Sequence, residues 1–264
     1  MELPLLGMGT WGMGGKYERD TSNMYESVCI LQNGLEIGYK LIDVAELYGD
    51  GLTEEIVGQA IKDFPREDVY IISKVWKNHL HYDAVLQAAK SSLERLGTSY
   101  IDLYLVHYPS EEVSLAETMP ALERLMAEGV VRAIGVSNFS VAEMKKAALY
   151  LKNTRLAANQ IEYNINSQAA EEDIIPYCQK NKIHVIAYRP LAKGGVSHST
   201  NRLLESVSKK YHKTAAQVAL NWIISQGITA IPKTARREHL VENYGALGWK
   251  LAPGDVASLC QEPA

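Results

Sequence analysis

Short apolar, β-branched runs alternate with amphipathic stretches from one end of the chain to the other. The runs predict eight strands, at residues 5–10, 41–44, 69–75, 101–106, 131–136, 157–161, 184–189 and 228–232. Continuous apolar runs are typical of strands that are buried on both faces of a parallel sheet. The strand-plus-helix repeat, roughly 30 residues long, is the size of one βα unit. The pattern therefore predicts an α/β protein built on a parallel sheet.

The stretches between the runs carry the marks of helices. One helix is indicated by apolar residues at three-to-four spacing, namely Leu86, Ala89, Leu93 and Leu96. Gly97 marks its end, because glycine readily takes the left-handed conformation found there. Two further helix starts match the capping-box pattern, Ser114 with Glu117 and Ser140 with Glu143. A last helix is predicted over residues 253–259.

The length of 264 residues fits either one large α/β barrel or two ordinary domains. No linker or low-complexity tract interrupts the repeat, which favours a closed (β/α)8 TIM barrel and a single domain over residues 1–264. A doubly wound sheet is the alternative, and Gly7, Gly9 and Gly12 superficially resemble its glycine-rich turn. These glycines do not fit the GxGxxG spacing followed by an acidic residue after a second strand, so the barrel is the better interpretation.

The composition excludes several classes of protein. The chain has 27 basic and 31 acidic residues, a formal charge of -4, and 47% hydrophobic positions, which is typical of a globular protein without nucleic-acid or membrane partners. Its three cysteines are far apart and lack metal-ligand spacing, so we expect no metal and reduced thiols in a cytoplasmic protein. No apolar run approaches the roughly 18 residues of a membrane span. We expect a monomer or a weak dimer.

Polar side chains follow three neighbouring predicted strands at the point where each strand ends. Asp43 lies at the end of the second strand with Tyr48 just after it, Lys74 lies at the end of the third, and His107 follows the fourth. In an α/β barrel the carboxyl ends of the strands carry the chemistry, so these four side chains are expected on one rim. Each has a structural alternative: Asp43 as a helix cap, Tyr48 as a loop cap, and Lys74 or His107 as solvated residues. Their combination favours catalysis.

The four residue types suit protonation of a carbonyl oxygen. A phenol with a pKa near 10 donates poorly at neutral pH unless a cation stabilises its phenolate. We expect Lys74 to lower the pKa of Tyr48 in this way and Asp43 to hold Lys74 protonated. His107 would orient the substrate carbonyl through Nε2.

No side chain in this set can deliver a hydride, so a bound cofactor must supply it. The later strand ends offer a seat for one. Amide and hydroxyl side chains and a flat ring, suited to a nicotinamide, follow strands five to seven: Ser137, Asn138, Asn159, Gln160 and Tyr188. Cations and glycines suited to phosphate groups follow strands seven and eight: Arg189, Lys193, Gly194, Gly195, Lys233, Thr234, Arg236 and Arg237. The alternative is that Arg236 and Arg237 only cover a solvated helix.

The chain resembles the aldo-keto reductase family over essentially its whole length. The motifs that carry the resemblance, in order, are 9–11 (GTW), 43–49 (DVAELYG), 73–74 (SK), 102–107 (DLYLVH), 135–139 (GVSNF), 231–234 (IPKT) and 242–243 (EN). The resemblance implies a (β/α)8 barrel, NADPH as the cofactor and a small carbonyl or alcohol compound as substrate. It also implies a catalytic tetrad at Asp43, Tyr48, Lys74 and His107.

The same resemblance implies a set of cofactor contacts. Ser137, Asn138 and Gln160 would hold the carboxamide, and Tyr188 would stack on the nicotinamide. The adenosine end would be held by Lys233, Thr234, Glu242 and Asn243. The remaining expected contacts are Gly9, Thr10, Trp11, Asp43, Arg189, Pro190, Leu191, Lys193, Gly194 and Arg237.

The chain departs from the family pattern at three positions. His239 stands where many members have arginine, so the contact to the 2'-phosphate is expected to move to Arg237, with NADH as a weaker alternative cofactor. Arg189 replaces a serine that precedes a proline in many relatives. Tyr108 stands where tryptophan is frequent. The expected substrate pocket comprises Trp11, Tyr48, Trp76, His107 and Tyr108, although Trp11, Trp76 and Tyr108 could be ordinary rim packing.

The prediction is an NADPH-dependent reductase of aldehydes and ketones to alcohols, which also catalyses the reverse oxidation, and two alternatives stay open. The first is a Schiff-base aldolase that uses Lys74 or Lys233 as the nucleophile. The Asp43 partner disfavours it, because an ion-paired lysine stays protonated. The second is a nucleotide-sensing or partner-binding protein that keeps the cofactor-binding site but catalyses no reaction.

Overall fold

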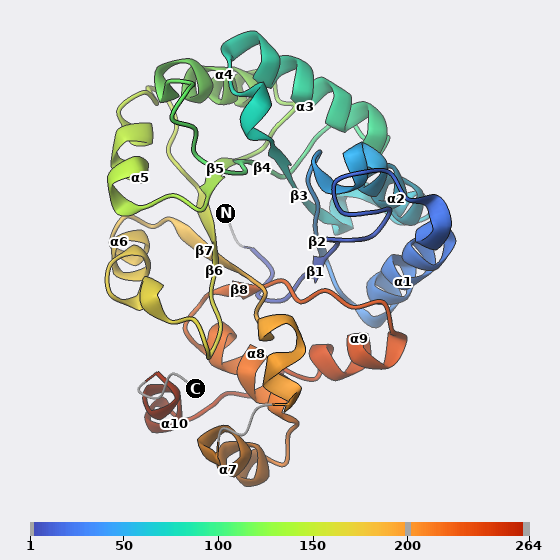
Figure 1. Ribbon diagram of the computed structural model, residues 1–264, viewed down its shortest axis with the longest axis vertical. Coiled ribbons are helices and arrows are strands. Elements are labelled where there is room, and N and C mark those ends of the chain that lie inside the picture. The colour runs from blue at the N-terminus through green and yellow to red at the C-terminus, as the bar shows by residue number, and fades with distance from the viewer. Residues whose placement is uncertain (1–2, 199–201, 261–264) are drawn as a thin grey trace.

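Eight parallel strands follow one another in chain order around a closed sheet, in a computed structural model that describes residues 3–198 and 202–260 (Figure 1). The strands are β1 (Met8–Gly9), β2 (Leu41–Asp43), β3 (Tyr70–Val75), β4 (Leu103–Val106), β5 (Ile134–Ser137), β6 (Ala158–Glu162), β7 (His184–Tyr188) and β8 (Thr229–Ala230). The Gly7 amide donates to the Ala230 carbonyl over 2.9 Å, and the Gly9 amide donates to the Pro232 carbonyl over 3.0 Å. These bonds join the first strand to the last and close the barrel.

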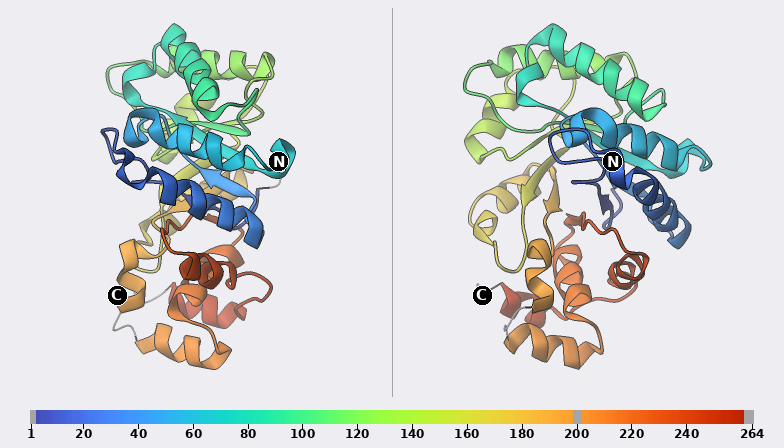
Figure 2. Two further views of the ribbon diagram at one scale, coloured as in Figure 1. Left: turned by 90° about the vertical axis from the view of Figure 1, so that its right-hand side faces the viewer. Right: turned by 45° about the vertical axis from the view of Figure 1, so that its right-hand side comes forward.

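Helices form a ring outside the strands (Figure 1). They are α1 (Met24–Ile37), α2 (Leu52–Ile61), α3 (Tyr82–Leu96), α4 (Leu115–Ala127), α5 (Val141–Ala148), α6 (Ile174–Lys180), α7 (Arg202–Tyr211), α8 (Ala215–Ser225), α9 (Arg237–Tyr244) and α10 (Pro253–Leu259). Short 3-10 turns are η1 (Thr21–Asn23), η2 (Tyr48–Gly51), η3 (Arg66–Asp68), η4 (Lys77–His79), η5 (Ala169–Glu171) and η6 (Ala192–His198). Helices α7 and α10 pack on α8 at one end of the molecule (Figure 2). Within residues 3–198 and 202–260, no helix is long and apolar enough to cross a membrane.

The predicted (β/α)8 barrel is confirmed, and the differences lie at the ends of elements. The first and last predicted strands shorten to β1 and β8, since the chain on either side pairs through isolated bonds across the closure. Helix α3 ends at Gly97, which takes φ 62°, and the capping box of Ser140 with Glu143 is present. The capping box at Ser114 is wrong. Ser114 accepts from the Ala116 amide, and the Glu117 carboxylate instead contacts His81 Nδ1 at 2.8 Å.

Buried apolar side chains form two layers. The inner layer fills the barrel from alternate strand positions and comprises Leu3, Leu41, Ile72, Leu103, Leu105, Ala133, Ala158, Ile186 and Ile231. A larger layer lies between the sheet and the helices, with Leu31, Ile56, Val85, Leu122 and Trp222 among its members. Because both faces of every strand are covered, the strand sequences read as continuous apolar runs. The two rims of the barrel are left for polar groups.

The rim at the amino ends of the strands holds a network of charged side chains. Asp102, directly before β4, accepts from Arg66 Nη2 over 2.7 Å and from Arg132 Nη1 over 3.3 Å. Its Oδ2 also accepts from the Ile71 amide over 3.0 Å. The Tyr100 ring lies between the two guanidinium groups, 3.9 Å from Arg66 Cζ and 3.6 Å from Arg132 Cζ. This network ties the starts of β3, β4 and β5 together.

Candidate active site

The four predicted catalytic side chains meet at the carboxyl ends of β2, β3 and β4. Asp43 is the last residue of β2, Lys74 lies in β3, His107 follows β4, and Tyr48 begins η2. Lys74 Nζ donates to Asp43 Oδ2 over 2.9 Å, to the Val44 carbonyl over 2.9 Å and to Tyr48 Oη over 3.2 Å. All three ammonium hydrogens are therefore used, and Lys74 is fully buried. The ammonium group is fixed between the carboxylate and the phenol.

The turn that presents Tyr48 depends on glycine. Gly49 has φ 55° and ψ 33°, in the left-handed region, and a Cβ atom there would collide with the Gly14 carbonyl oxygen. Only glycine avoids both the backbone strain and the collision. The Gly49 amide donates to the Lys16 carbonyl over 3.0 Å, which joins this turn to the loop after β1. The turn lets the chain reverse directly after Tyr48 and leaves the phenol against Lys74.

The second oxygen of Asp43 is bonded from across the barrel. Gln160 Nε2, at the carboxyl end of β6, donates to Asp43 Oδ1 over 2.7 Å. The two side chains are buried and 117 positions apart in the sequence. Sequence reasoning assigned Gln160 to a carboxamide but did not find this bond, which exists only once the barrel closes. Both carboxylate oxygens of Asp43 therefore have a fixed donor.

Burial dominates the ionisation of this cluster. It raises the pKa of Tyr48 well above its usual value, and the Asp43 carboxylate raises that pKa further. Burial also lowers the pKa of Lys74, with the Asp43 carboxylate opposing the change. The net pKa of Tyr48 is raised because the buried phenolate would lose its contact with water, and the expected lowering by Lys74 stays a prediction. Tyr48 is a neutral phenol at neutral pH, the form that carries a proton to donate.

His107 is a neutral imidazole. Burial, and secondarily the Lys74 charge, lowers the pKa of His107 to about 2. Its ring meets the Tyr48 ring edge-on at a centroid distance of 5.6 Å, and its carbonyl accepts from Asn138 Nδ2 over 3.1 Å. Its buried Nδ1 has no hydrogen-bond partner among the described residues. A neutral ring can donate one hydrogen bond to an oxygen without exchanging protons near neutral pH.

Aromatic rings border the Tyr48 and His107 pair on two sides. Trp11 lies edge-on to Tyr48 at 4.8 Å between centroids, and Tyr17 lies edge-on to Trp11 at 5.2 Å. On the other side Trp76 meets the His107 ring at 5.1 Å. The predicted pocket residues Trp11, Trp76 and Tyr108 are thus brought to this rim, with Tyr108 stacked on His107 at 5.5 Å. Tyr17 was missed, because its loop returns to the rim only through the turn contacts with Gly49.

Four of the five side chains predicted to hold a nicotinamide form one connected group, and the exception is Asn159, whose buried Nδ2 donates to the Phe139 carbonyl over 2.9 Å. Asn138, with φ 62°, donates from Nδ2 to Ser137 Oγ over 3.0 Å and accepts from Tyr188 Oη over 2.8 Å. Ser137 Oγ donates to the Gln160 carbonyl over 3.0 Å. The hydroxyl of Tyr188 is thereby tied, which fixes the plane of its half-buried ring. A rigid flat ring next to amide groups suits a planar heterocycle that bears a carboxamide.

The side chains predicted to hold phosphate groups are more exposed and more scattered. Arg189, with φ 51°, pairs through Nη1 with Glu162 Oε2 at 2.8 Å. Arg237, at the start of α9, donates from Nε to Asn33 Oδ1 over 3.1 Å. The other cations on the loops after β7 and β8, Lys193, Lys233 and Arg236, are exposed.

The rest of the predicted cofactor set has varied surroundings. Thr10 Oγ1 donates to the Asp43 carbonyl over 2.7 Å, and Thr234 Oγ1 accepts from the Arg236 amide over 3.1 Å. Pro190 and Asn243 are buried, whereas Leu191 and Glu242 are partly buried. A Cβ atom on Gly194 would meet no atom within 4 Å, while one on Gly9 would lie 2.8 Å from the Ile231 carbonyl oxygen. Gly9 lies in β1, the Pro190, Leu191 and Gly194 positions follow β7, and Glu242 and Asn243 lie in α9.

This donor set fits a dinucleotide. A dinucleotide needs anion-binding groups for its phosphates and hydrogen-bond partners for its carboxamide, and the site offers both in separate places. Arg189 and Lys193, after β7, and Arg237, after β8, supply cations. The eight-residue helix α9 begins at Arg237, and the free amides at a helix start favour phosphate. Among the described residues, no cluster of three or more His, Cys, Asp or Glu side chains could hold a metal ion.

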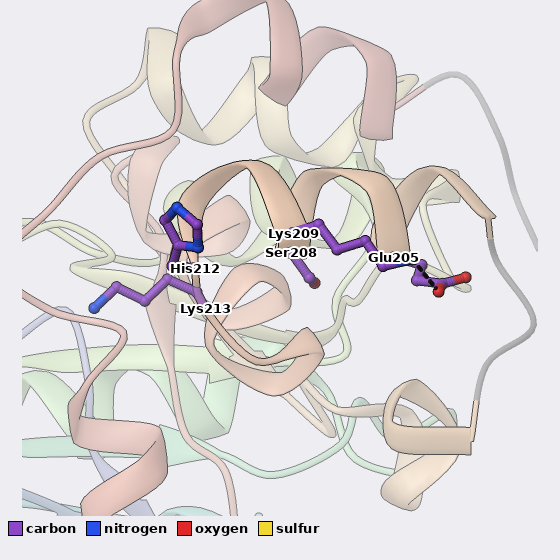
Figure 3. Close-up of a pocket in the computed structure, with 5 residues that line it drawn as sticks. All are labelled: Glu205, Ser208, Lys209, His212 and Lys213. Carbon is purple, nitrogen blue, oxygen red and sulfur yellow. Dashed lines mark hydrogen bonds and ion pairs between the residues drawn. The ribbon is translucent and has the colours of Figure 1, made fainter.

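Two hollows lie elsewhere on the surface. One is lined by Glu205, Ser208, Lys209, His212 and Lys213, on and just after α7, with Lys209 Nζ bonded to Glu205 Oε1 at 2.7 Å (Figure 3). The other borders the Asp102 network at the amino ends of the strands. Neither hollow includes a residue of the tetrad. The candidate site is therefore the group around Asp43, Tyr48, Lys74 and His107 at the carboxyl ends of the strands, and neither hollow is part of it.

Comparison with known proteins agrees with this geometry. The Aldo/keto reductase family profile matches residues 5–261. The methylglyoxal reductase YeaE of Escherichia coli (strain K12) is 38% identical over 263 residues, which cover 98% of this chain and 90% of that protein. The glyoxal reductase of Bacillus subtilis (strain 168) is 32% identical, over 97% of this chain and 87% of that protein.

Solved structures show the same fold. The thermostable aldo-keto reductase Tm1743, in complex with the inhibitor epalrestat, superimposes with a TM-score of 0.94 at 41% identity, covering 98% of this chain and 94% of that chain. An aldo/keto reductase from Klebsiella pneumoniae in complex with NADP and acetate has a TM-score of 0.88 at 37% identity, covering 97% and 90%. The likeness extends over nearly all of both chains in each case.

Proposed function

The chain belongs to the aldo/keto reductase family and is an oxidoreductase of carbonyl and alcohol groups, and on that premise we propose that it reduces aldehydes and ketones with NADPH and with Tyr48 as the proton donor. The observation that carries the proposal is the contact of Lys74 Nζ with both Asp43 Oδ2 and Tyr48 Oη, at 2.9 and 3.2 Å. A fixed cation against a phenol oxygen stabilises the phenolate that forms when the proton leaves.

The direction of the hydrogen bonds favours donation by Tyr48. Lys74 donates to the phenol oxygen, and no described residue accepts the phenol hydrogen, so that hydrogen is left for a substrate oxygen. His107, neutral across the physiological pH range, would donate a second hydrogen bond to the same oxygen and orient the carbonyl. The proton would pass from Tyr48 to the substrate oxygen as negative charge develops there.

NADPH would supply the hydride. The residues proposed to hold it are Ser137, Asn138 and Gln160 for the carboxamide, Tyr188 for the ring, and the cations after β7 and β8 for the phosphates. Lys233, in the loop before α9, and Arg237, the first residue of α9, are the proposed contacts of the 2'-phosphate. Gln160 would serve two purposes, since its Nε2 is also bonded to Asp43. The relatives crystallised with NADP or NADPH support this choice of cofactor.

The surroundings of Lys74 give no support to a Schiff-base aldolase. A nucleophilic amine must be deprotonated and must reach a substrate carbon. Lys74 is fully buried and donates three hydrogen bonds, so its nitrogen has no free lone pair to present. We therefore place Lys74 in the proton-transfer group.

The test is consumption of NADPH, followed by its absorbance, with methylglyoxal and with 4-nitrobenzaldehyde as substrates. We expect turnover with NADPH and a lower kcat/KM with NADH. NADPH that binds tightly and is not consumed with any carbonyl compound would contradict the proposal and favour a nucleotide-sensing protein. Equal kcat/KM for both cofactors would contradict the roles of Lys233 and Arg237. Borohydride trapping of a covalent adduct would favour the aldolase.

A further inference from the structure

A buried carboxylate lies beside the candidate site without belonging to it. Glu46 stands between β2 and η2, and its side chain is only 8% exposed. Its Oε1 accepts from the Trp76 amide over 2.5 Å and from His79 Nδ1 over 3.1 Å. One oxygen thus holds two donors from the loop between β3 and α3. No step of the proposed reaction uses Glu46.

The loop that Glu46 holds carries one wall of the pocket. Trp76 is the first residue after β3, and its ring meets the His107 ring at 5.1 Å and the Tyr108 ring at 5.8 Å between centroids. The loop continues as η4, which ends at His79. Glu46 binds the backbone amide of Trp76, the residue that carries this ring. The bond therefore limits movement of the Trp76 backbone and of the ring attached to it.

The same carboxylate joins the wall to the catalytic turn. Glu46 lies two positions before Tyr48, and its own amide donates to the Lys74 carbonyl over 3.4 Å. The segment that carries Tyr48 and the loop that carries the Trp76 ring are therefore fastened to each other at Glu46. The distance between the reacting oxygen and the aromatic wall depends on this fastening.

We propose that Glu46 is a positioning residue that fixes the Trp76 wall relative to Tyr48, and thereby sets the preference for carbonyl compounds with an aryl group over small ones. The inference rests on the proposed reductase function. A compound whose carbonyl is held by Tyr48 and His107 must extend past these groups to gain from contact with the Trp76 ring. Methylglyoxal is too short to gain much, whereas 4-nitrobenzaldehyde places a ring there. Loss of Glu46 would therefore selectively weaken the binding of the larger compound.

The chain offers a matched control for the loss of a loop-holding carboxylate. Glu123 Oε1, on α4, accepts from the amides of Lys152, Asn153 and Thr154 over 2.9, 2.6 and 3.1 Å. It has the same chemistry as Glu46, a carboxylate oxygen that holds a loop by its amides. It lies in the outer ring of helices, and its hydrogen bonds among the described residues go to the loop after α5. Glu123→Ala thus measures the effect of releasing a loop as such.

The experiment compares Glu46→Ala, Glu46→Gln, Glu123→Ala and Trp76→Ala with the wild type. The readout is the ratio of kcat/KM for 4-nitrobenzaldehyde to kcat/KM for methylglyoxal. In Glu46→Ala we expect this ratio to fall about tenfold, through the KM of the aryl compound, because a hydrogen bond to a charged acceptor is lost. The dissociation constant of NADPH should not change. Glu46→Gln keeps an oxygen acceptor and should recover most of the ratio, and Glu123→Ala should leave it unchanged.

A double variant separates positioning from general damage. Trp76→Ala should lower the ratio by itself, and Glu46→Ala added to it should lower the ratio no further, because the two changes act on one wall. An unchanged ratio in Glu46→Ala, with the same loss of melting temperature as Glu123→Ala, would show that Glu46 only staples a loop and would overturn the proposal.

Hydrogen exchange tests the same proposal without turnover. The amides of residues 76–79 should exchange faster in Glu46→Ala than in the wild type, and Glu123→Ala should leave them unchanged. Faster exchange in an enzyme that consumes no NADPH would uphold the fastening and reject the reductase function. Unchanged exchange at residues 76–79 would reject the fastening whatever the activity.

Discussion

Two buried aspartates at opposite ends of the barrel each form an ion pair, but the residues around the two pairs differ. Asp43, at the carboxyl end of β2, is 3% exposed and lies 2.9 Å from Lys74 Nζ. Asp102, at the amino end of β4, is 5% exposed and lies 2.7 Å from Arg66 Nη2. Each carboxylate uses both oxygens, and each joins neighbouring strands. By burial and distance alone the two carboxylates could not be told apart, although the Lys74 side chain is fully buried and the Arg66 side chain is 19% exposed.

The partners of the two aspartates distinguish them. Asp102 is held by Arg66 and Arg132, a residue type that does not serve as a proton donor, and the Tyr100 ring packs against both guanidinium groups. Asp43 is held by a lysine that also bonds a neutral phenol, and a phenol can give up a proton. A buried ion pair thus becomes chemically useful when it touches a group that can transfer a proton. We assign the amino-end network to stability and the carboxyl-end group to reaction, as is usual in such barrels.

The largest expected effect comes from removing Tyr48, the proposed proton donor at the carboxyl end. Tyr48→Phe should lower kcat on the order of 10²–10⁴-fold, the usual contribution of a positioned acid. The fold should be kept, because the ring and its packing stay. The measurements are kcat with 4-nitrobenzaldehyde and the NADPH dissociation constant by fluorescence, which should be near the wild-type value. Retained turnover would remove Tyr48 from its proposed role.

Removing a cation at the amino end should act on stability instead. Arg66→Ala leaves the Asp102 carboxylate with the Arg132 guanidinium and the Ile71 amide, so we expect a loss of about 3 kcal/mol of unfolding free energy, the lower end of the range for breaking a buried pair. Urea unfolding measures this loss. The kcat of the folded fraction should stay within about twofold of the wild type, since a change far from the site is usually independent of it. A large loss of kcat with unchanged stability would reverse our assignment of this network.

A smaller effect is expected at the donor that crosses the barrel. Gln160→Leu removes the hydrogen bond to Asp43 Oδ1 and should lower kcat by roughly tenfold or more, since a bond to a charged acceptor is worth about 1.5–3 kcal/mol. The proposed carboxamide contact would be lost as well, so the KM for NADPH should also rise. Gln160→Glu serves as a comparison, because it adds a like charge beside Asp43 and should be worse than leucine. Wild-type kcat in the leucine variant would show that Lys74 alone holds Asp43.

The smallest effect is a change with pH that arises at His107. Its pKa is about 2 in the folded protein and about 6.5 when exposed, so the unfolded chain takes up the proton first as the pH falls. The contribution of the neutral ring to the free energy of unfolding is thus fully present above pH 6.5. Below that pH it decreases by up to about 1.4 kcal/mol per pH unit. Urea unfolding at pH 7 and pH 5 should show a smaller difference in His107→Gln than in the wild type. An inflection of kcat/KM near pH 6.5 that disappears in His107→Gln would contradict a neutral imidazole.

Most of the fold and the positions of the tetrad could be predicted from the sequence. The apolar runs set the strands, the closed order followed from eight unbroken units, and the ends of the runs located Asp43, Lys74 and His107. These features depend on local patterns and on one general rule of barrels. The capping box at Ser114 failed because a distant histidine, His81, competes for the Glu117 carboxylate.

What could not be predicted depends on contacts that only the closed barrel creates. The bond between Gln160 and Asp43 joins strands on opposite sides of the barrel, and the contact of Glu46 with the Trp76 amide joins two loops. The raised pKa of Tyr48 was also missed, because it reflects the loss of water around the phenol and not its neighbours in the chain. Side-chain type identifies which group can react, and burial determines the state in which it does so.

The most direct test of this division is the turnover of two matched variants, Asp43→Asn and Asp102→Asn, measured as NADPH consumption under saturating substrate at a temperature where both are folded. Each substitution keeps the shape of the side chain and removes one buried charge. We predict that Asp43→Asn loses on the order of 10²-fold in kcat, while Asp102→Asn turns over at the wild-type rate and unfolds at lower urea. Equal losses of kcat in the two variants, or wild-type turnover in Asp43→Asn, would contradict the assignment of reaction to the carboxyl end and stability to the amino end.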